Sequence, residues 1–321
     1  MKFKKLNLGQ RVIEYLKSRE GQRFTAREIA IWVMESYPEA CREKLEKSRA
    51  IKNDDALLQQ LVAEIGASRP AMQKREPGLR TTEGRPRKYY YSLLSDQDEV
   101  DALEDRGKIV DSSSEAPGLV SSRKIHEHDL YPLLAEYLKG EFSVYCKRID
   151  EKRSSNRRGS GGNHWLYPDM AAMEDLGAEW HRELQECVRQ YSVRRTRLWS
   201  FEVKLLLNRS NVRECFFQAV SNSSWANFGY LVAAEITGVD TLKELRMLSA
   251  AHGIGVIQLD SEDTSNSQIL IPAREREVMD WEMMNRLVEE NADFKAYVTL
   301  VRQFYQTGDV READWETPAR K

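Results

Sequence analysis

The chain has 321 residues, of which 41% are hydrophobic and 31% charged, with a formal net charge of −2 at pH 7. These values predict a globular protein of two domains, and so small a net charge favours no class of partner. No apolar run approaches the roughly 18 residues of a membrane span, and the N-terminus lacks the apolar segment of a signal peptide. The four cysteines are scattered, without a CxxC pair, which argues against a disulfide framework or a zinc site. We therefore expect a cytoplasmic protein with reduced thiols.

Residues 1–94 are predicted to form the first domain, which begins with two helices. Apolar residues at helical spacing predict a helix over 10–19. Thr25 followed three positions later by Glu28 is the sequence of a capping box. It should begin a second helix that ends before Pro38.

A third helix is expected over 53–65, with Gly66 as its C-cap. The span 69–88 is rich in proline and glycine, and a β run over 89–93 follows it. Three helices and then a turn-rich hairpin form the layout of a winged helix. Seven Lys or Arg against two Glu in 69–88 give this hairpin the charge of a DNA-backbone contact. The residues expected to contact DNA here are Lys74, Arg75, Arg80, Arg85, Arg87 and Lys88.

Residues 95–122 differ in composition from the domain before them. Eight Asp or Glu oppose one Arg and one Lys, and a Ser-Ser-Ser run and a Pro-Gly pair follow. This composition predicts a flexible linker. Its like charges should keep it extended and away from DNA.

Residues 123–321 are predicted to form a second, α/β domain. Alternating helices and strands favour a mixed sheet flanked by helices. The tail over 275–310 is amphipathic and helical, which suits either a dimer contact or packing within the chain. The expected elements are helices over 127–138, 178–191, 211–222 and 241–252, and strands over 142–149, 165–172, 198–206, 230–236 and 255–259.

The residues that point to chemistry are Pro168-Asp169 and Glu202-Val203-Lys204. On a strand, Glu202 and Lys204 share one face while Val203 points into the core. Asp169 and Glu202 could bind a hard divalent cation through oxygen, which would polarise a phosphate and activate a water. Lys204 would orient that water and hold negative charge in the transition state. The alternative is an ion pair between Glu202 and Lys204 that only offsets the cost of burial.

Two further residues are candidates for the same site, and each has a structural alternative. Glu127 lies near the start of a predicted helix, where it would either reach the metal or stabilise the helix dipole. Gln218 lies on the helix after the Glu-X-Lys strand. It would bind a metal-bound water or phosphate, or be an ordinary helix-surface amide. The neighbouring His126 and His128 are expected at the surface, since Glu-X-X-His zinc spacing is absent.

Arg157 and Arg158 lie in a loop of Gly, Ser and Arg over 153–163. The loop suits either contact with phosphates or simple exposure to solvent. It lacks the Gly-Lys-Ser/Thr ending of a P-loop, so no nucleotide binding is expected.

The second domain resembles the PD-(D/E)XK, or restriction-endonuclease-like, nuclease superfamily through Glu127, Pro168-Asp169, Glu202-Val203-Lys204 and Gln218. The segments around Asp169 and Gln218 are similar to a bacterial group labelled HrgA-like, which joins a winged helix to a restriction-endonuclease-like core. The first domain is similar to HARE-type helix-turn-helix modules through residues 25–30. Together the resemblance spans about residues 5–260.

This resemblance implies Mg²⁺-dependent hydrolysis of phosphodiester bonds, with Mn²⁺ as a substitute. It implies that Asp169, Glu202 and Val203 bind the metal, that Lys204 is the catalytic lysine, and that Glu127 and Gln218 support them. The helical insert between Asp169 and Glu202 is longer than a simple hairpin, which departs from the family pattern. It is expected to pack beside the sheet or gate the cleft.

The expected fold class is α/β, an N-terminal winged helix-turn-helix followed by a restriction-endonuclease-like mixed sheet flanked by helices. The expected function is a DNA endonuclease in bacterial restriction or phage defence. Its expected partner is double-stranded DNA, and no association with a membrane is expected. One core holds one active site, so cutting both strands would need a homodimer or two encounters. The alternatives are a DNA-binding regulator without activity and a structure-specific repair nuclease.

Overall fold

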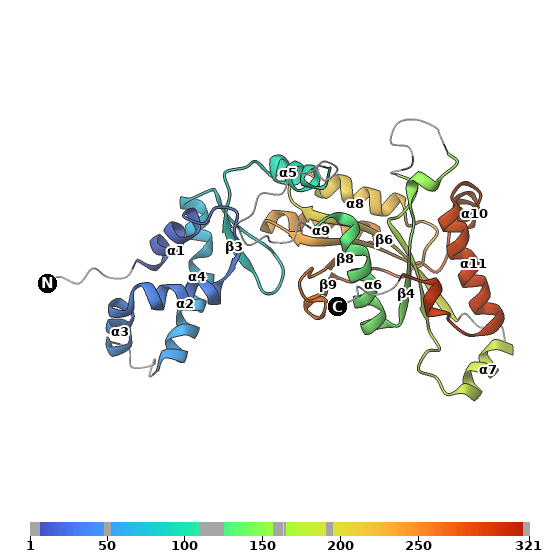
Figure 1. Cartoon of the computed structure of the whole chain (residues 1–321), viewed down its shortest axis with the longest axis horizontal. Coiled ribbons are helices and arrows are strands. Elements are labelled where there is room, and N and C mark those ends of the chain that lie inside the picture. The colour runs from blue at the N-terminus through green and yellow to red at the C-terminus, as the bar shows by residue number, and fades with distance from the viewer. Residues whose placement is uncertain are drawn as a thin grey trace, which may run out of the picture. The chain divides into compact units, whose positions relative to one another are not determined.

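The computed structural model describes residues 7–47, 53–108, 125–156, 163, 165–190 and 195–316. The chain divides into two compact units, one of Met1–Glu99 with Thr237–Val239 and one of Val100–Ile236 with Asp240–Lys321. Each unit has its own helices and its own sheet (Figure 1). Within the described residues, the helices are all too short or too polar to span a membrane.

The first unit consists of helices and a small antiparallel sheet of three strands. The sheet order is β1-β3-β2. Val12, Leu16, Ile29 and Leu61 are fully buried between the helices. The elements are α1 (Leu8–Lys17), β1 (Phe24–Thr25), α2 (Ala26–Ser36), α3 (Pro38–Lys47), α4 (Asp54–Arg75), β2 (Leu79–Thr81) and β3 (Lys88–Tyr91).

The predicted capping box is confirmed at the start of α2. The main-chain N–H of Glu28 donates to Oγ1 of Thr25 at 3.2 Å, and the N–H of Thr25 donates to Oε2 of Glu28 at 2.7 Å. The helix ends at Ser36, before Pro38, as expected. Two main-chain N–H groups that have no partner within the helix are therefore hydrogen-bonded to side chains of the capping box.

Two expectations for the first unit were wrong. Helix α3 was not predicted, because its sequence is strongly polar. Helix α4 does not end at Gly66 but continues through Pro70 to Arg75, so the first third of the expected hairpin is helical. The continuation buries Met72 against Gly9 of α1, and burying a side chain of this size offsets the hydrogen bond that proline cannot make.

The start of the expected linker is also ordered, which corrects the prediction of an extended segment. Residues Asp96–Lys108 form helix α5. Its first turn is capped by Ser95, whose hydroxyl accepts the N–H of Asp98 at 3.1 Å and whose own N–H donates to the Asp98 carboxylate at 3.3 Å. Acidic side chains in a first turn also favour helix through the dipole. The rest of the expected linker, 109–122, lies outside the described residues.

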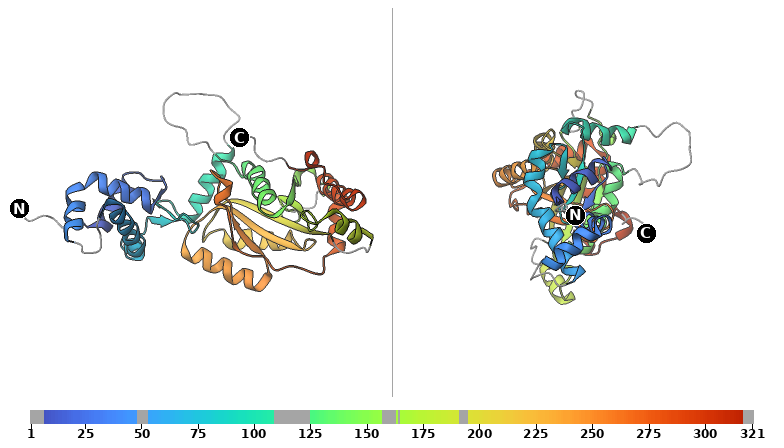
Figure 2. Two further views of the ribbon diagram at one scale, coloured as in Figure 1. Left: turned by 90° about the horizontal axis from the view of Figure 1, so that it is seen from below. Right: turned by 90° about the vertical axis from the view of Figure 1, so that its left-hand side faces the viewer.

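The second unit is built on a six-stranded mixed sheet with helices on both faces (Figure 2). The strands lie in chain order; β4, β5 and β6 are antiparallel, β6, β7 and β8 are parallel, and β9 returns antiparallel to β8. The strands are β4 (Val144–Arg148), β5 (Met170–Asp175), β6 (Thr196–Leu207), β7 (Phe228–Ile236), β8 (Gly255–Gln258) and β9 (Gln268–Ile271). The helices are α6 (Leu130–Phe142), α7 (Arg182–Gln190), α8 (Val212–Ser221), α9 (Val239–His252), α10 (Trp281–Glu290) and α11 (Ala292–Thr307).

The mixed sheet was predicted, but several boundaries and one strand were not. The strand expected over 165–172 is β5, which begins only at Met170. Strand β9 was missed, although its Gln-Ile-Leu-Ile sequence lies between Ser267 and Pro272 and has the pattern of a short turn-bounded strand. The expected helix over 127–138 starts as a 3₁₀ turn, Glu127–Asp129, before α6 begins at Leu130.

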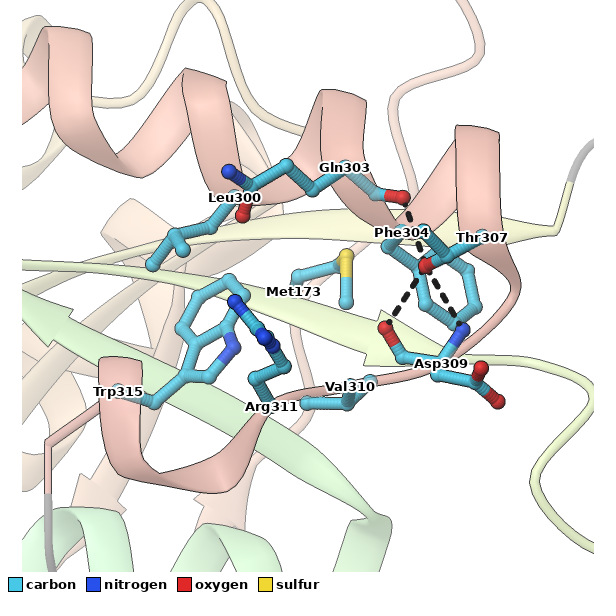
Figure 3. Close-up of a pocket in the computed structure, with 9 residues that line it drawn as sticks. All are labelled: Met173, Leu300, Gln303, Phe304, Thr307, Asp309, Val310, Arg311 and Trp315. Atoms are coloured by element: carbon cyan, nitrogen blue, oxygen red, sulfur yellow. Dashed lines mark hydrogen bonds between the residues drawn. The ribbon is translucent and has the colours of Figure 1, made fainter.

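The C-terminal tail packs against its own unit. Phe294, Tyr297 and Phe304 of α11 are buried, and the hydroxyl of Tyr297 donates to the carbonyl oxygen of Ala172 at 2.9 Å. A cavity of about 350 Å³ remains between α11, Met173 of β5 and the segment after the helix (Figure 3). The apolar face of α11 therefore packs within the chain, which is one of the two arrangements expected for this tail.

Candidate active site

The pairing of β5 with β6 brings the two expected metal-binding acids together. Met170 lies opposite Phe201 in this antiparallel ladder, so Asp169, one residue earlier, lies opposite the Glu202 position. The main-chain N–H of Val203 donates to Oδ2 of Asp169 at 2.7 Å. Strand register thus fixes the separation of two acids that lie thirty-three residues apart in the sequence.

Lys204 lies at the centre of three carboxylates. Its Nζ is 2.6 Å from Oε1 of Glu202, 3.9 Å from Oε2 of Glu127 and 4.0 Å from Oδ2 of Asp169. Four of the five expected site residues therefore meet, from the residue before β5, from β6 and from the 3₁₀ turn before α6. The Glu127 carboxylate, for which the sequence left both a metal-site role and a helix-dipole role open, lies 3.9 Å from the Lys204 ammonium group.

Burial and mutual charge control the protonation of this cluster. Glu202 is 1% exposed, and burial together with the charge of Asp169 raises its pKa well above the ordinary value, although Lys204 lowers it. Burial alone would lower the pKa of Lys204, but Asp169, Glu202 and Glu127 raise it well above the ordinary value. Lys204 is therefore a cation at neutral pH.

The Glu127 side chain is partly exposed, at 38% against 22% for Asp169 and 1% for Glu202, and the rest of it is desolvated by the protein. Burial raises its pKa to about 7; Lys204 opposes this rise and the charge of Asp169 adds to it. A carboxyl group with a pKa near neutrality can exchange a proton under physiological conditions. Glu127 therefore combines the geometry and the titration range of a proton-exchanging group.

Two side chains that the sequence analysis did not single out bind these acids. Asn222, the C-cap of α8, is buried, and its Nδ2 donates to Oε2 of Glu202 at 3.0 Å and to the carbonyl oxygen of Tyr167 at 2.8 Å. Tyr131, in the first turn of α6, places its hydroxyl 3.3 Å from both Oε1 of Glu127 and Oδ1 of Asp169. Burial, then the charges of these two acids, raises the pKa of Tyr131, so its hydroxyl keeps the proton.

The fifth expected residue, Gln218, lies on α8 one turn before Asn222. It is buried rather than exposed, so its interpretation as a helix-surface amide is wrong. Asn222, the C-cap of the same helix, donates its amide N–H to Glu202.

A cavity of about 460 Å³ opens beside Glu127 and Lys204. Its wall also contains His126, His128 and Lys152, Val100, Leu103 and Glu104 of α5, and Leu205 and Leu206 of β6. The rings of His126 and His128 stack with centroids 5.2 Å apart. The histidines are accessible, as expected, but they also line the cavity beside the acids.

The basic residues expected to contact DNA in the first unit fall into two groups. Lys74 and Arg75, at the end of α4, and Arg85, between β2 and β3, are exposed. Arg80 instead bonds to Asp96 at 2.9 Å and Glu99 at 2.6 Å. The guanidinium of Arg80 thus neutralises acids of its own unit and does not extend the basic surface.

Two more residues of this set are partly enclosed. Arg87 bonds to the buried Glu83 at 3.0 Å, and Lys88 is half-buried in β3. Arg157 and Arg158 lie outside the described residues, as does most of their loop. Among the described residues of this set, those with exposed side chains are therefore Lys74 and Arg75 at the end of α4 and Arg85 between β2 and β3.

The donor set of the cluster fits a hard divalent cation. Three carboxyl groups surround one ammonium group, and hard divalent cations prefer carboxylate and carbonyl oxygens as ligands. The N–H and C=O of one strand residue point to the same side. Because the N–H of Val203 is bound to Asp169, its carbonyl oxygen is also directed toward this acid and can contribute to the site. No group of three or more His, Cys, Asp and Glu in the described part of the chain has the geometry of a metal site. The expected set, two carboxylates and one main-chain carbonyl, needs only two such side chains.

In comparisons with known proteins, no family model, no curated protein and no solved structure matches this chain. What the site can do is therefore inferred from its own residues and their geometry.

Proposed function

We propose that this protein is a Mg²⁺-dependent deoxyribonuclease that hydrolyses phosphodiester bonds in double-stranded DNA. The observation that carries the proposal is the convergence of Asp169, Glu202 and Glu127 on the ammonium group of Lys204. Acids from β6 and from the residue before β5, together with a buried lysine beside a cavity that Lys152 and two histidines line, suit a phosphodiester and its metal ion. A structural ion pair between Glu202 and Lys204 alone would not require the other two acids.

Each residue has a distinct role in this proposal. Asp169, Glu202 and the carbonyl oxygen of Val203 would hold Mg²⁺, or Mn²⁺ in its place. When bound, the cation would polarise the phosphate and lower the pKa of water. Lys204, held as a cation, would donate to a phosphate oxygen and stabilise the added negative charge. Glu127 would accept a proton near neutral pH.

We also propose the finer fold assignments on this basis. The first unit would be a winged helix-turn-helix module that binds duplex DNA through Lys74, Arg75 and Arg85. The second unit would be a restriction-endonuclease-like core, because Asp169 directly precedes β5 and Glu202 lies on its antiparallel neighbour β6, which is followed by a parallel β7. A cytoplasmic role in bacterial restriction or phage defence is consistent with these two activities in one chain. A homodimer would supply two active sites, one for each strand.

The test is cleavage of a DNA panel by the purified full chain. Supercoiled plasmid, methylated plasmid and branched duplexes are incubated with Mg²⁺, with Mn²⁺ and with EDTA. The proposal predicts nicking or linearisation with either metal and none with EDTA. Cleavage restricted to branched duplexes would favour a repair nuclease. DNA binding without cleavage of any substrate would favour a DNA-binding regulator and overturn the proposal.

A further inference from the structure

Tyr131 lies between the two acids that Lys204 does not bind closely. Lys204 is in hydrogen-bond contact with Glu202 but is 3.9 Å and 4.0 Å from Glu127 and Asp169. On the described residues, the hydrogen-bond donor to the Glu127 side chain is the Tyr131 hydroxyl. The same hydroxyl lies at the same distance, 3.3 Å, from Asp169. Tyr131 therefore links Glu127 of the 3₁₀ turn to Asp169, the residue before β5.

The chemistry of a phenol suits this position. A phenol has one proton to donate, so it can bond to one carboxylate at a time and must share that proton between the two. A neutral donor placed between like charges lets the two carboxylates approach without adding charge of its own. A buried lysine at the same place would instead neutralise one acid and compete with a cation for it.

The ring of Tyr131 is held in place from two sides. The side chain is 7% exposed, in the same apolar cluster as Leu130 and Leu134 of α6. The guanidinium of Arg148, at the end of β4, lies 5.1 Å from the ring centroid, within the range of a cation–π contact. The hydroxyl is thus fixed by the fold and does not depend on the acids for its position.

We propose that Tyr131 is a positioning residue that orients Glu127 and Asp169 for the divalent cation. This inference rests on the proposed function, because it assumes that the acids bind a metal. It adds a residue to the site that touches neither the cation nor DNA. Outer partners of metal ligands typically change metal affinity by about 10- to 100-fold when they are removed.

The variant that tests this role is Tyr131→Phe, which removes the hydroxyl and keeps the ring. Tyr137→Phe is the matched control, because Tyr137 lies on the same helix and is similarly buried, at 8% exposure. Mn²⁺ binding to each full-length protein without DNA is measured by calorimetry. The Mg²⁺ concentration that gives half-maximal cleavage is measured separately.

The proposal predicts that Tyr131→Phe weakens Mn²⁺ binding about tenfold and raises the half-maximal Mg²⁺ concentration by a similar factor, while Tyr137→Phe changes neither. Excess Mg²⁺ should restore the cleavage rate of Tyr131→Phe, which it would not do for a misfolded site. Unchanged Mn²⁺ affinity in a folded Tyr131→Phe protein, or no restoration by Mg²⁺, overturns the positioning role alone. A wild-type protein that binds no Mn²⁺ and cuts no DNA overturns the proposed function as well.

Discussion

The main-chain N–H of Val203 donates a 2.7 Å hydrogen bond to the side chain of Asp169. Val203 separates Glu202 from Lys204, so the strand that carries the Glu-X-Lys pair also holds the acid of the neighbouring strand. A main-chain donor is supplied by every residue except proline. The position of Asp169 therefore depends on strand register and not on the identity of the side chain at 203.

This bond separates two variants of Asp169. Asp169→Asn keeps an oxygen that can accept the Val203 N–H, whereas Asp169→Ala leaves that donor unpaired at a cost of about 1–2 kcal/mol. Both remove the charge that the proposed metal needs. We expect both variants to lose cleavage, and urea unfolding to show the lower stability in Asp169→Ala. Equal stabilities would contradict the structural role of the bond, and cleavage by either variant would contradict the metal role.

Asn222 is expected to be important for stability as well as for the site. Asn222→Ala would leave a buried carboxylate oxygen of Glu202 and the carbonyl of Tyr167 without their donor. Each unmet buried acceptor costs on the order of 1–3 kcal/mol, so we expect a loss of about 3 kcal/mol in urea unfolding. Asn285→Ala, on the exposed face of α10, should change stability by no more than about 0.5 kcal/mol. Similar effects in the two variants would show that the Asn222 contacts contribute little.

Glu127 predicts a pH dependence with a definite sign. Its pKa is about 7 in the folded protein and 4.5 as its ordinary value, so folding favours its protonated form. The stability that this group contributes is complete below about pH 4.5 and is lost as the pH rises through about 7. The free energy of unfolding of Glu127→Gln should therefore rise relative to that of the wild type between about pH 4.5 and about pH 7. Above about pH 7 the difference between the two proteins should stay constant.

Thermal unfolding of both proteins from pH 4 to pH 9, without divalent metal, measures this difference. Glu289→Gln on the exposed face of α10 is the control, and it should follow the wild type throughout. Parallel curves for Glu127→Gln and wild type would rule out the raised pKa.

The basic residues of the first unit should separate into those that bind DNA and those that stabilise the fold. Replacing the exposed Lys74 and Arg75 together by Ala should weaken duplex binding and lower the slope of log K against log salt by about 2. Arg80→Ala should leave that slope unchanged and destabilise the unit by roughly 2 kcal/mol, because it leaves the buried Glu99 without its cation. Fluorescence anisotropy at several salt concentrations, with urea unfolding, distinguishes the two. A smaller slope for Arg80→Ala would place this residue on DNA.

The sequence pattern predicted those features that depend on local spacing. The capping box of Thr25 and Glu28 needs only three residues of separation, and Glu202 and Lys204 share a strand face through the two-residue period. The meeting of Asp169 with this pair followed from placing them on adjacent strands. Each of these predictions depends only on the spacing within one helix or strand, or on one pair of adjacent strands.

The residues missed were those whose role depends on packing between elements. Tyr131 lies four residues after Glu127, a spacing at which helix side chains meet, and this was the available signal. Asn222 gave no such signal, because its partner Glu202 lies twenty residues earlier on a strand. Helix α4 was predicted too short because Gly66 and Pro70 oppose helix locally, whereas the burial of Met72 acts only in the folded unit.

The central claim is that Lys204 and its three acids form a metal-dependent phosphodiesterase. It is tested most directly by comparing wild type, Lys204→Ala and Lys147→Ala in plasmid nicking with Mg²⁺. Lys147 is a half-buried lysine of β4 in the same sheet, and its Nζ donates to the carbonyl oxygen of Asp314 at 3.2 Å. The claim predicts that wild type and Lys147→Ala nick the plasmid, and that Lys204→Ala binds DNA normally but nicks at least 100-fold more slowly, as loss of about 3 kcal/mol of transition-state stabilisation requires. Nicking by Lys204→Ala at the wild-type rate would contradict the claim.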